Sequence, residues 1–248
     1  GFRVGYQGVK GCFSHQACLE YFGESTEAVS LESFKDIFDA IQKEEIKYGV
    51  LPIENSSSGS ITEVYDLIRQ YNFFILGEKC LKIEHNLMGV KGAQISDIKE
   101  VYSHYQGFLQ CGRFLTDMPD VKTIPHFDTA GSAEYVSGIG DKTKACIAGK
   151  NAARIYGLDI LKENIQSFNN NHTRFIIIGK ELEVDRDADK ISVIISIPHK
   201  SGALYDILKY FADHKSNMQK IESRPMDGEP WQYFFYIDFS GNIEEKNT

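Results

Sequence analysis

The sequence predicts an α/β fold followed by a smaller α+β unit, and three observations support this. Short apolar runs alternate with helical patterns up to about residue 180. The stretch 179–190 (GKELEVDRDADK) is polar and charged, as is typical of a boundary between domains. Beyond it the order of elements changes to strand, helix, strand, strand. We therefore expect one domain over residues 1–180 and a second over 190–248.

The first part contains six apolar runs of strand length: Phe2 to Tyr6, Gly49 to Ile53, Phe73 to Leu76, Val101 to Ser103, Ala145 to Ala148 and Phe175 to Ile178. Apolar residues recur at the spacing of one helix face in 34–41 and again in 61–68. Ser60 and Glu63 form a candidate capping box for the second helix. This alternation predicts a largely parallel sheet, with ligands at the carboxyl ends of its strands.

The second part begins with an apolar strand at 191–197, followed by a helix whose apolar face runs through 204–211. Two further strands follow at 218–225 and 232–239. This β-α-β-β order is the first part of a ferredoxin-like unit, whose full order is β-α-β-β-α-β. We expect the last helix and strand of that unit to be missing from the chain as given.

Composition excludes several classes of function. The net charge of −8 disfavours nucleic-acid binding, which needs Lys and Arg to neutralise phosphates. No apolar run reaches the roughly 20 residues of a membrane span, and no signal-peptide pattern opens the chain. The five cysteines are scattered and include no C-x-x-C pair, which indicates reduced thiols and no zinc site. Gly8–Ser14 is glycine-rich but matches no nucleotide-binding fingerprint. We therefore expect a cytoplasmic protein without nucleic-acid, membrane or metal partners.

Three strand-to-loop junctions carry more polar side chains than a turn requires. In the first, the strand at 49–53 runs into the segment 54–58 (ENSSS) ahead of a helix. Free N–H groups and the positive dipole end at a helix N-terminus suit a carboxylate ligand. The same composition is that of a Ser-rich turn that only caps the helix, so both interpretations stay open.

The second junction is Ser103-His104-Tyr105-Gln106, with Gln110 four residues after Gln106 and on the same predicted helix face. Ser103 and His104 are neighbours on a strand and point to opposite faces, which disfavours a Ser-His hydrolase. We interpret His104 as structural. At the third junction, Arg174 stands at the mouth of an apolar strand. It needs an anionic partner, either an acidic side chain or a dicarboxylate substrate.

Four segments of this chain resemble the successive motifs of the prephenate dehydratase family: Gly8–Ser14, Leu51–Gly59, Ser103–Gln110 and Asn171–Phe175. The tail is similar to the phenylalanine-binding ACT domain of those enzymes in two further segments, Ser201–Leu204 and Glu222–Pro225. The resemblance covers essentially the whole chain in the family's order and spacing. Tyr105 stands where the family usually has Pro, and His15 where it usually has an acidic residue.

The resemblance implies a catalytic domain of two α/β subdomains, like a periplasmic binding protein, with chain crossovers near residues 80 and 165. It implies conversion of prephenate to phenylpyruvate in phenylalanine biosynthesis, without a metal or organic cofactor. It also implies allosteric regulation by L-phenylalanine in a homodimer or homotetramer. Two alternatives remain. One is an arogenate dehydratase, because Thr129–Ser132 is similar to a loop of the plant enzymes, and the other is a non-catalytic amino-acid sensor.

The family's functional residues map by resemblance onto three groups. The catalytic group is Thr173, the principal residue, with Asn55, Ser103 and Gln110. The substrate-binding group is Ser56, Gln106, Arg174 and Phe175. The phenylalanine-binding group is Gly202, Ala203, Leu204, Glu222, Ser223, Arg224 and Pro225.

Overall fold

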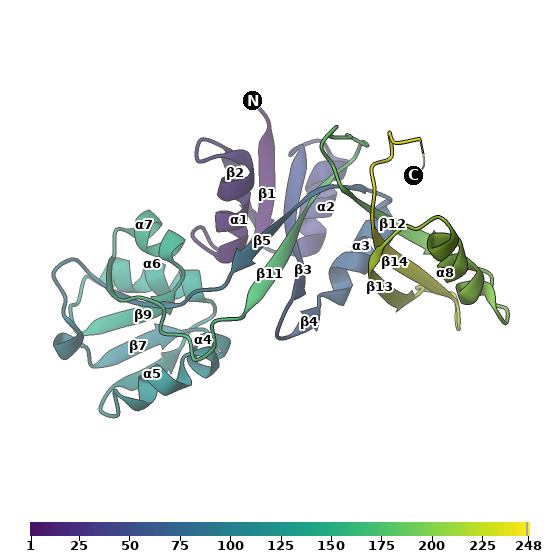
Figure 1. Ribbon diagram of the computed structural model, residues 1–248. Coiled ribbons are helices and arrows are strands. Elements are labelled where there is room, and N and C mark those ends of the chain that lie inside the picture. The colour runs from purple at the N-terminus through teal and green to yellow at the C-terminus, as the bar shows by residue number, and fades with distance from the viewer. Residues whose placement is uncertain (247) are drawn as a thin grey trace. The chain divides into compact units, whose positions relative to one another are not determined.

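The computed structural model describes residues 1–246 and 248, which form two compact units. The first unit combines Gly1–Ser60 with Gly77–Ile177, and the second combines Ile61–Leu76 with Ile178–Thr248. Figure 1 labels their helices and strands. No helix in the described part of the chain is long and apolar enough to cross a membrane.

The first sheet contains the N-terminal strands. Its order is β2 (Glu27–Leu31), β1 (Arg3–Gln7), β3 (Tyr48–Asn55), β11 (His172–Gly179) and β5 (Phe74–Lys82), with the short β4 (Gly59–Ser60) paired to β3. Strand β1 is parallel to both β2 and β3. Tyr6 stacks on His15 of α1 (Phe13–Phe22), whereas Gly5 faces Ile37 of α2 (Phe34–Gln42). Because neighbours on a strand point to opposite faces, the two helices cover opposite faces of the sheet.

The second sheet lies within the same unit. Its order is β10 (Asp159–Lys162), β6 (Asn86–Gly89), β9 (Lys144–Ala148), β7 (Glu100–Ser103) and β8 (Lys122–Pro125). Strand β7 is parallel to β8 and β9, whereas β6 is antiparallel to β9 and β10. The prediction of a largely parallel sheet is therefore wrong in detail. The chain enters this sheet at β6 directly from β5, without the helical connection that a parallel neighbour needs.

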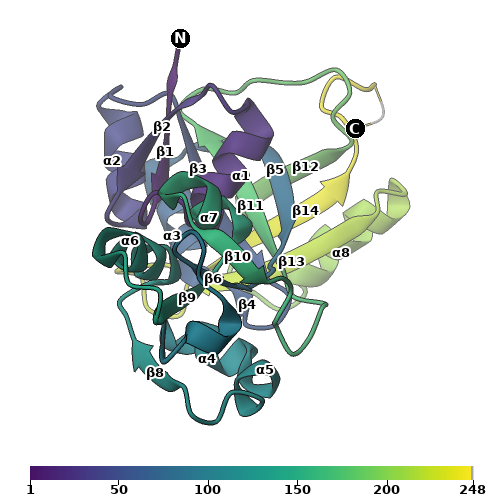
Figure 2. The same cartoon turned by 90° about the vertical axis from the view of Figure 1, so that its left-hand side faces the viewer.

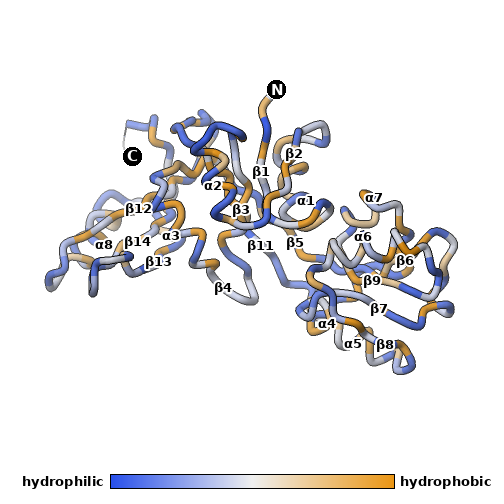
Figure 3. Tube along the Cα trace, turned by 180° about the vertical axis from the view of Figure 1, so that it is seen from behind, coloured by the Kyte–Doolittle hydropathy of each residue, from blue (hydrophilic) through white to orange (hydrophobic). Residues whose placement is uncertain are grey.

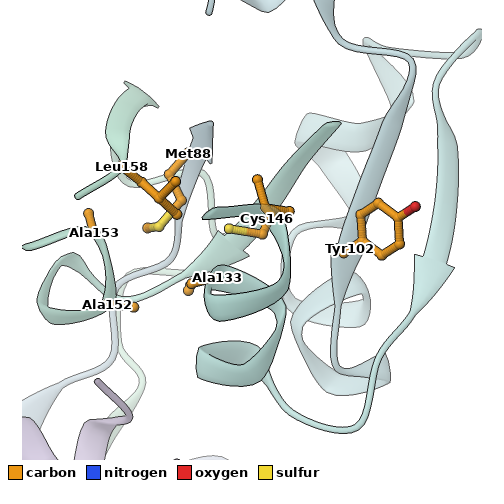
Figure 4. Close-up of a cluster of buried hydrophobic side chains, with 9 residues drawn as sticks. Met88, Tyr102, Ala133, Cys146, Ala152, Ala153 and Leu158 are labelled. Carbon is orange, nitrogen blue, oxygen red and sulfur yellow. The ribbon is translucent and has the colours of Figure 1, made fainter. Parts of the chain in front are cut away.

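Helices cover both faces of the second sheet, as Figures 1 and 2 show. Helices α6 (Thr129–Ile139) and α7 (Lys150–Tyr156) pack over a cluster that includes Met88 and Cys146 (Figure 4). On the other face, α4 (Tyr105–Gln110) and α5 (Gly112–Thr116) contribute to a second cluster. Hydrophobic residues alternate with polar loops along the chain (Figure 3), as a three-layer packing of this kind requires.

Two extended segments join the sheets side by side. One leads from β5 to β6 and the other from β10 to β11, and Figure 1 shows both. The amide of Ile83 donates to the carbonyl oxygen of Asn171 at 2.8 Å, and Ile165 donates to His85 at 2.9 Å. These backbone bonds fix the register between the outgoing and the returning segment.

The second unit is built on an antiparallel sheet in the order β12 (Lys190–Ser196), β14 (Tyr233–Ser240), β13 (Met218–Pro225). Helix α8 (Ala203–Asp213) connects β12 to β13, and β14 lies between them, which gives the split β-α-β order of a ferredoxin-like unit. Phe211 of α8 packs on Phe239, with ring centroids 4.9 Å apart.

Helix α3 (Thr62–Tyr71) belongs to this second unit, a grouping that the sequence does not indicate. The ring of Tyr65 packs edge-on against Tyr236 at 4.7 Å. Asp66 accepts two hydrogen bonds from the guanidinium of Arg224, at 2.9 and 2.7 Å. The predicted capping box places the N-cap of α3 at Ser60, whereas in the structure Ser60 lies in β4 and Ile61 holds the N-cap position.

Candidate active site

The side chains of Asn55 and Thr173 meet at the ends of two neighbouring strands, β3 and β11. The Nδ2 atom of Asn55 donates to the Oγ1 atom of Thr173 at 2.9 Å. Thr173 is only 8% exposed. These residues are 118 positions apart in the sequence, and the sheet places them side by side.

The loop after β3 determines which way the amide of Asn55 points. The backbone N–H groups of Ser57 and Ser58 both donate to Oδ1 of Asn55, at 2.8 and 3.1 Å. Only the amide oxygen can accept these bonds, so Nδ2 must face Thr173. The Thr173 oxygen therefore accepts from Asn55, and its own hydroxyl proton is free to point at a ligand.

Ser56 joins the loop after β3 to the segment before β11. Its amide donates to the His172 carbonyl oxygen at 2.9 Å, and its hydroxyl accepts from the His172 amide at 2.8 Å. The same hydroxyl donates to the Asn170 carbonyl oxygen at 3.0 Å. Ser56 therefore fixes the two strand ends that carry Asn55 and Thr173.

Arg174 and Phe175 follow Thr173 on β11 and point to alternate faces. The guanidinium of Arg174 donates to Glu54 at 3.1 Å and lies 3.9 Å from Glu78, on the neighbouring strands β3 and β5. The partner that the sequence required for Arg174 thus includes acidic side chains of the protein itself. Phe175 is 2% exposed and packs in the interior on the same face as Thr173.

Ser103 ends β7 and is fully buried, with its hydroxyl donating to the Ile147 carbonyl oxygen at 3.3 Å. Gly107 makes room for it, because a Cβ atom at that position would overlap the Ser103 hydroxyl. His104 is exposed and caps α4, with Nδ1 accepting from the Gln106 amide at 3.2 Å. Tyr105 occupies the first position of α4, where the Pro usual in the family would also fit. The side chain of Gln106 is exposed.

Gln110, at the end of α4, contacts the crossover segments with both its backbone and its side chain. Its carbonyl oxygen accepts from the Ser167 amide at 2.7 Å. Its Oε1 atom is hydrogen-bonded to Nε2 of His85, which is 3% exposed. His85 lies two residues after Ile83, whose amide is bonded to Asn171, two residues before Thr173. Two extended residues span about 7 Å. The hydrogen bond between Ile83 and Asn171 therefore fixes the distance between His85, which holds Gln110, and Thr173.

The glycine-rich loop before α1 packs against α7. Gly11 has a φ of +97°, and an added Cβ would lie 3.2 Å from the Cα atom of Ala152. The Gly11 amide donates to Nδ1 of His15 at 3.0 Å. His15 thus supplies a hydrogen-bond acceptor at a position where the family usually has an acidic side chain. Burial raises the pKa of the Cys12 thiol in this loop to about 11, which makes it a poor nucleophile.

The structure thus brings together the predicted catalytic residues Asn55 and Thr173 and the predicted substrate-binding residue Ser56 at the first sheet. The other two predicted catalytic residues lie at the second sheet, Ser103 at the end of β7 and Gln110 at the end of α4. Among residues 1–246 and 248, no group of three His, Cys, Asp or Glu side chains could hold a metal ion.

A family model described as prephenate dehydratase matches residues 4–183. The chain belongs to the prephenate dehydratase family. A bifunctional chorismate mutase/prephenate dehydratase of Enterobacter agglomerans is 36% identical over 98% of this chain and 64% of its own length. An arogenate dehydratase/prephenate dehydratase of Arabidopsis thaliana is 38% identical over 98% of this chain and 66% of its own length. The chain thus spans about two thirds of the length of these relatives.

Solved structures of prephenate dehydratase type share this fold along nearly the whole chain. The enzyme of Arthrobacter aurescens, solved in complex with L-Phe, superposes with a TM-score of 0.85 at 27% identity, covering 99% of this chain and 82% of that one. A protein described as a quorum-quenching acylase superposes with a TM-score of 0.87 at 26% identity, covering 98% and 88%. The two descriptions name different activities, so the likeness of the backbones does not decide the chemistry.

The sequence alone did not identify His85 or the acidic partners of Arg174 as parts of the site. His85 is a single histidine between Glu84 and Asn86 that belongs to no recognisable motif, and such a residue is more often structural than functional. Glu54 directly follows the buried strand and was the available signal, because a carboxylate there needs a cation. Glu78 lies in a strand whose pairing with β11 the sequence does not reveal.

The two buried histidines of this unit predict how stability depends on pH. Burial lowers the pKa of both His15 and His85 below the ordinary value of 6.5, and Lys10 and Arg154 lower that of His15 further. Both rings stay neutral in the folded chain while the unfolded chain takes up protons below pH 6.5. Their contribution to stability is therefore present above 6.5 and is lost as the pH falls below it. We expect a lower urea midpoint at about pH 5.5 than at about pH 7.5. A midpoint that stays constant would contradict this.

Proposed function

We propose that this chain is a prephenate dehydratase, a lyase that converts prephenate to phenylpyruvate in L-phenylalanine biosynthesis. The observation that carries the proposal is the Asn55–Thr173 hydrogen bond, which leaves the hydroxyl proton of a buried threonine available for a ligand. Membership of the prephenate dehydratase family supports it. In this proposal Thr173 is the principal catalytic residue and no metal or organic cofactor takes part.

The reaction removes carbon dioxide and water from prephenate. The bond between the ring and its carboxylate breaks, its electron pair enters the ring, and the ring C–O bond breaks as the ring becomes aromatic. The departing oxygen gains negative charge and needs a hydrogen-bond donor. It leaves as water by taking the proton of that donor, which is replaced from solvent. The Thr173 hydroxyl supplies that donor, and the Asn55 amide stabilises negative charge that develops on Thr173. A positioned donor of this type typically lowers a barrier by about 3 kcal/mol.

The other proposed contacts come from both sheets of the unit. Asn55, Ser103 and Gln110 act with Thr173, and Gln106 adds a polar group for a carboxylate of prephenate. Ser56 is a proposed substrate-binding residue by resemblance, and its hydrogen bonds to residues 170 and 172 hold the strand ends in place. Arg174 and Phe175 are proposed substrate-binding residues by resemblance. The ion pair of Arg174 with Glu54 and the burial of Phe175 also support a role in holding β11 and Thr173 in place.

Arogenate dehydratase activity is the second candidate, because a relative 38% identical carries both names. Arogenate differs from prephenate by an amino group in place of the side-chain keto group, so binding contacts rather than chemistry separate the two substrates. Side-by-side assays of prephenate and arogenate decide between them. Higher kcat/KM for prephenate supports the proposal, and higher kcat/KM for arogenate supports the alternative.

A hydrolase and a non-catalytic sensor are less well supported. The Ser103 hydroxyl is buried on the Ile147 carbonyl oxygen, whereas His104 caps α4, so they do not form a nucleophile and base. A sensor would bind its amino acid without forming phenylpyruvate, and the same assay identifies it.

We also propose that the second unit is an ACT domain over residues 190–248 that binds L-phenylalanine, and that the first domain spans residues 1–180 with crossovers near 80 and 165. A pocket of about 140 Å³ at one end of the sheet supports the ligand site, and Ala203, Leu204 and Tyr233 are among its lining residues. Pro225, at the end of the edge strand β13, lies opposite Tyr233. The L-Phe complex of the Arthrobacter aurescens enzyme gives the ligand class.

The proposed phenylalanine-binding residues of β13 point to different sides. Glu222 and Arg224 share one face, on which Arg224 holds Asp66 of α3, whereas Ser223 points to the other. Helix α3 follows the Asn55 loop after β4 and the single residue Ile61. A change that a ligand induces in β13 is therefore linked to the loop after Asn55, first by the Arg224–Asp66 ion pair and then by the chain that runs from α3 back to that loop. This link supports allosteric regulation. Pairing of two such domains in a homodimer or homotetramer, in the cytoplasm, completes the proposal.

Gly202 provides a test of the phenylalanine site. Its φ of +86° makes Val unfavourable there, although an added Cβ would meet no atom within 4 Å. We expect calorimetric titration to show L-phenylalanine binding to the intact chain and a loss of about tenfold or more in affinity for Gly202→Val. Gly140→Val is the matched control, because Gly140 ends α6 at φ +70° with equally open surroundings. Equal binding by the Gly202 variant, or no binding by the intact chain, would contradict the assignment.

A further inference from the structure

His85 is a buried ring whose contacts converge on Gln110. It is 3% exposed, and its Nε2 atom is hydrogen-bonded to Oε1 of Gln110. Its backbone is held on both sides, with the amide donating to Gln166 Oε1 at 2.8 Å and the carbonyl oxygen accepting from Ile165 at 2.9 Å. The ring packs edge-on against Phe13, with centroids 5.8 Å apart. The ring therefore has a fixed position from which to act on Gln110.

The contact with His85 also determines the orientation of the Gln110 amide. No hydrogen-bond partner for Nδ1 of His85 exists among the described residues. If Gln110 donated its NH₂ group to Nε2, the proton of the neutral ring would sit on Nδ1 as a buried donor without an acceptor. Orphaned buried N–H groups are rarer and costlier than unpaired acceptors. The arrangement with the proton on Nε2, donating to the Gln110 oxygen, is therefore the stable one.

Burial lowers the pKa of His85, which keeps the ring neutral near pH 7 and its Nε2 proton available for this bond. With Oε1 held by His85, the Nε2 amino group of Gln110 points away from the ring. That group carries two N–H donors, and its own α4 backbone is held by Ser167. Two fixed N–H donors suit a carboxylate or hydroxyl oxygen.

We propose that His85 is a positioning residue for Gln110: its Nε2–H holds the amide oxygen so that the amide NH₂ group faces an oxygen of the substrate. This role rests on the proposed dehydratase function. His85 itself does not touch the substrate. Without it, the Gln110 amide is free to rotate and presents its oxygen, which repels a carboxylate, for part of the time.

A double-mutant cycle on the full chain tests the role. His85→Phe keeps a flat ring against Phe13 and removes the donor, and Gln110→Ala removes the group that His85 is proposed to orient. We expect His85→Phe to lower kcat/KM for prephenate about tenfold, which corresponds to one lost hydrogen bond. In the Gln110→Ala background the same change has no further effect, because the oriented group is gone. Losses that multiply in the double variant, or an unchanged kcat/KM in His85→Phe, overturn the proposal.

Two further measurements separate this outcome from loss of fold and from failure of the proposed function. His85→Gln restores a donor and is expected to recover part of the lost kcat/KM, whereas a ring needed only for packing would not be replaced in this way. Nitrogen NMR of labelled histidine reports the tautomer without any turnover. We expect a proton on Nε2 of His85 and a shift of that signal in Gln110→Ala. A proton on Nδ1 overturns the orientation, and absence of turnover by the unmodified chain refutes the dehydratase function and with it this role.

Discussion

Replacing Thr173 by Ala is expected to lower the turnover of prephenate by about 100-fold or more, the largest effect of any single substitution in the site. The hydroxyl that donates to the departing oxygen is lost, while β11 keeps its place in the sheet between β3 and β5. Thr173 is 8% exposed and accepts from Asn55, so losing its methyl and hydroxyl groups also lowers stability, and the melting midpoint measures that loss separately from the rate.

Thr173→Ser is the matched control for this experiment. It keeps the hydroxyl that Asn55 holds and removes only a methyl group, so part of the activity is expected to remain. Steady-state kinetics and a melting midpoint for the three proteins give the comparison. Near-normal turnover by Thr173→Ala with an intact fold would show that another group assists the departing oxygen.

Asn55→Asp is expected to have the second largest effect, a fall in turnover of roughly 10- to 100-fold. A carboxylate at this position still accepts the N–H bonds of Ser57 and Ser58, so the loop keeps its shape. It cannot donate to Thr173, and its negative charge opposes negative charge on the departing oxygen. The substitution therefore removes the catalytic contact and leaves the structural one.

Asn55→Ala provides the contrast, because it removes both roles. We expect a lower melting midpoint for the Ala variant than for the Asp variant, since two loop N–H groups lose their acceptor. Circular dichroism and initial rates measure the two effects separately. If Asn55→Asp retained full turnover, the hydrogen bond to Thr173 would have no part in the reaction.

Much of the fold was predictable where residue patterns are strong. The helix predicted at 34–41 is confirmed as α2, and the strand predicted at 218–225 is confirmed as β13. Helices α6 and α7 were not predicted, because their buried residues are mostly Ala, Gly and Ser. These small residues give little difference in hydropathy between the buried and the exposed face of a helix. Strands such as β10 were not predicted, because they are short and largely exposed.

The site was predictable as a set of residues but not as a set of contacts. The motif identified Asn55 and Thr173, yet only the order of β3 and β11 in the sheet shows that their side chains meet. The pairing of Arg224 with Asp66 is equally invisible, because it joins positions 158 apart. Contacts of this type depend on tertiary packing, and single-residue chemistry carries no signal for them.

The most direct test of the central claim is the product balance of the unmodified chain with prephenate. The account predicts release of one carbon dioxide and one phenylpyruvate for each prephenate consumed, at a rate that Thr173→Ala lowers by about 100-fold or more. Formation of phenylpyruvate no faster than in the absence of protein would contradict it.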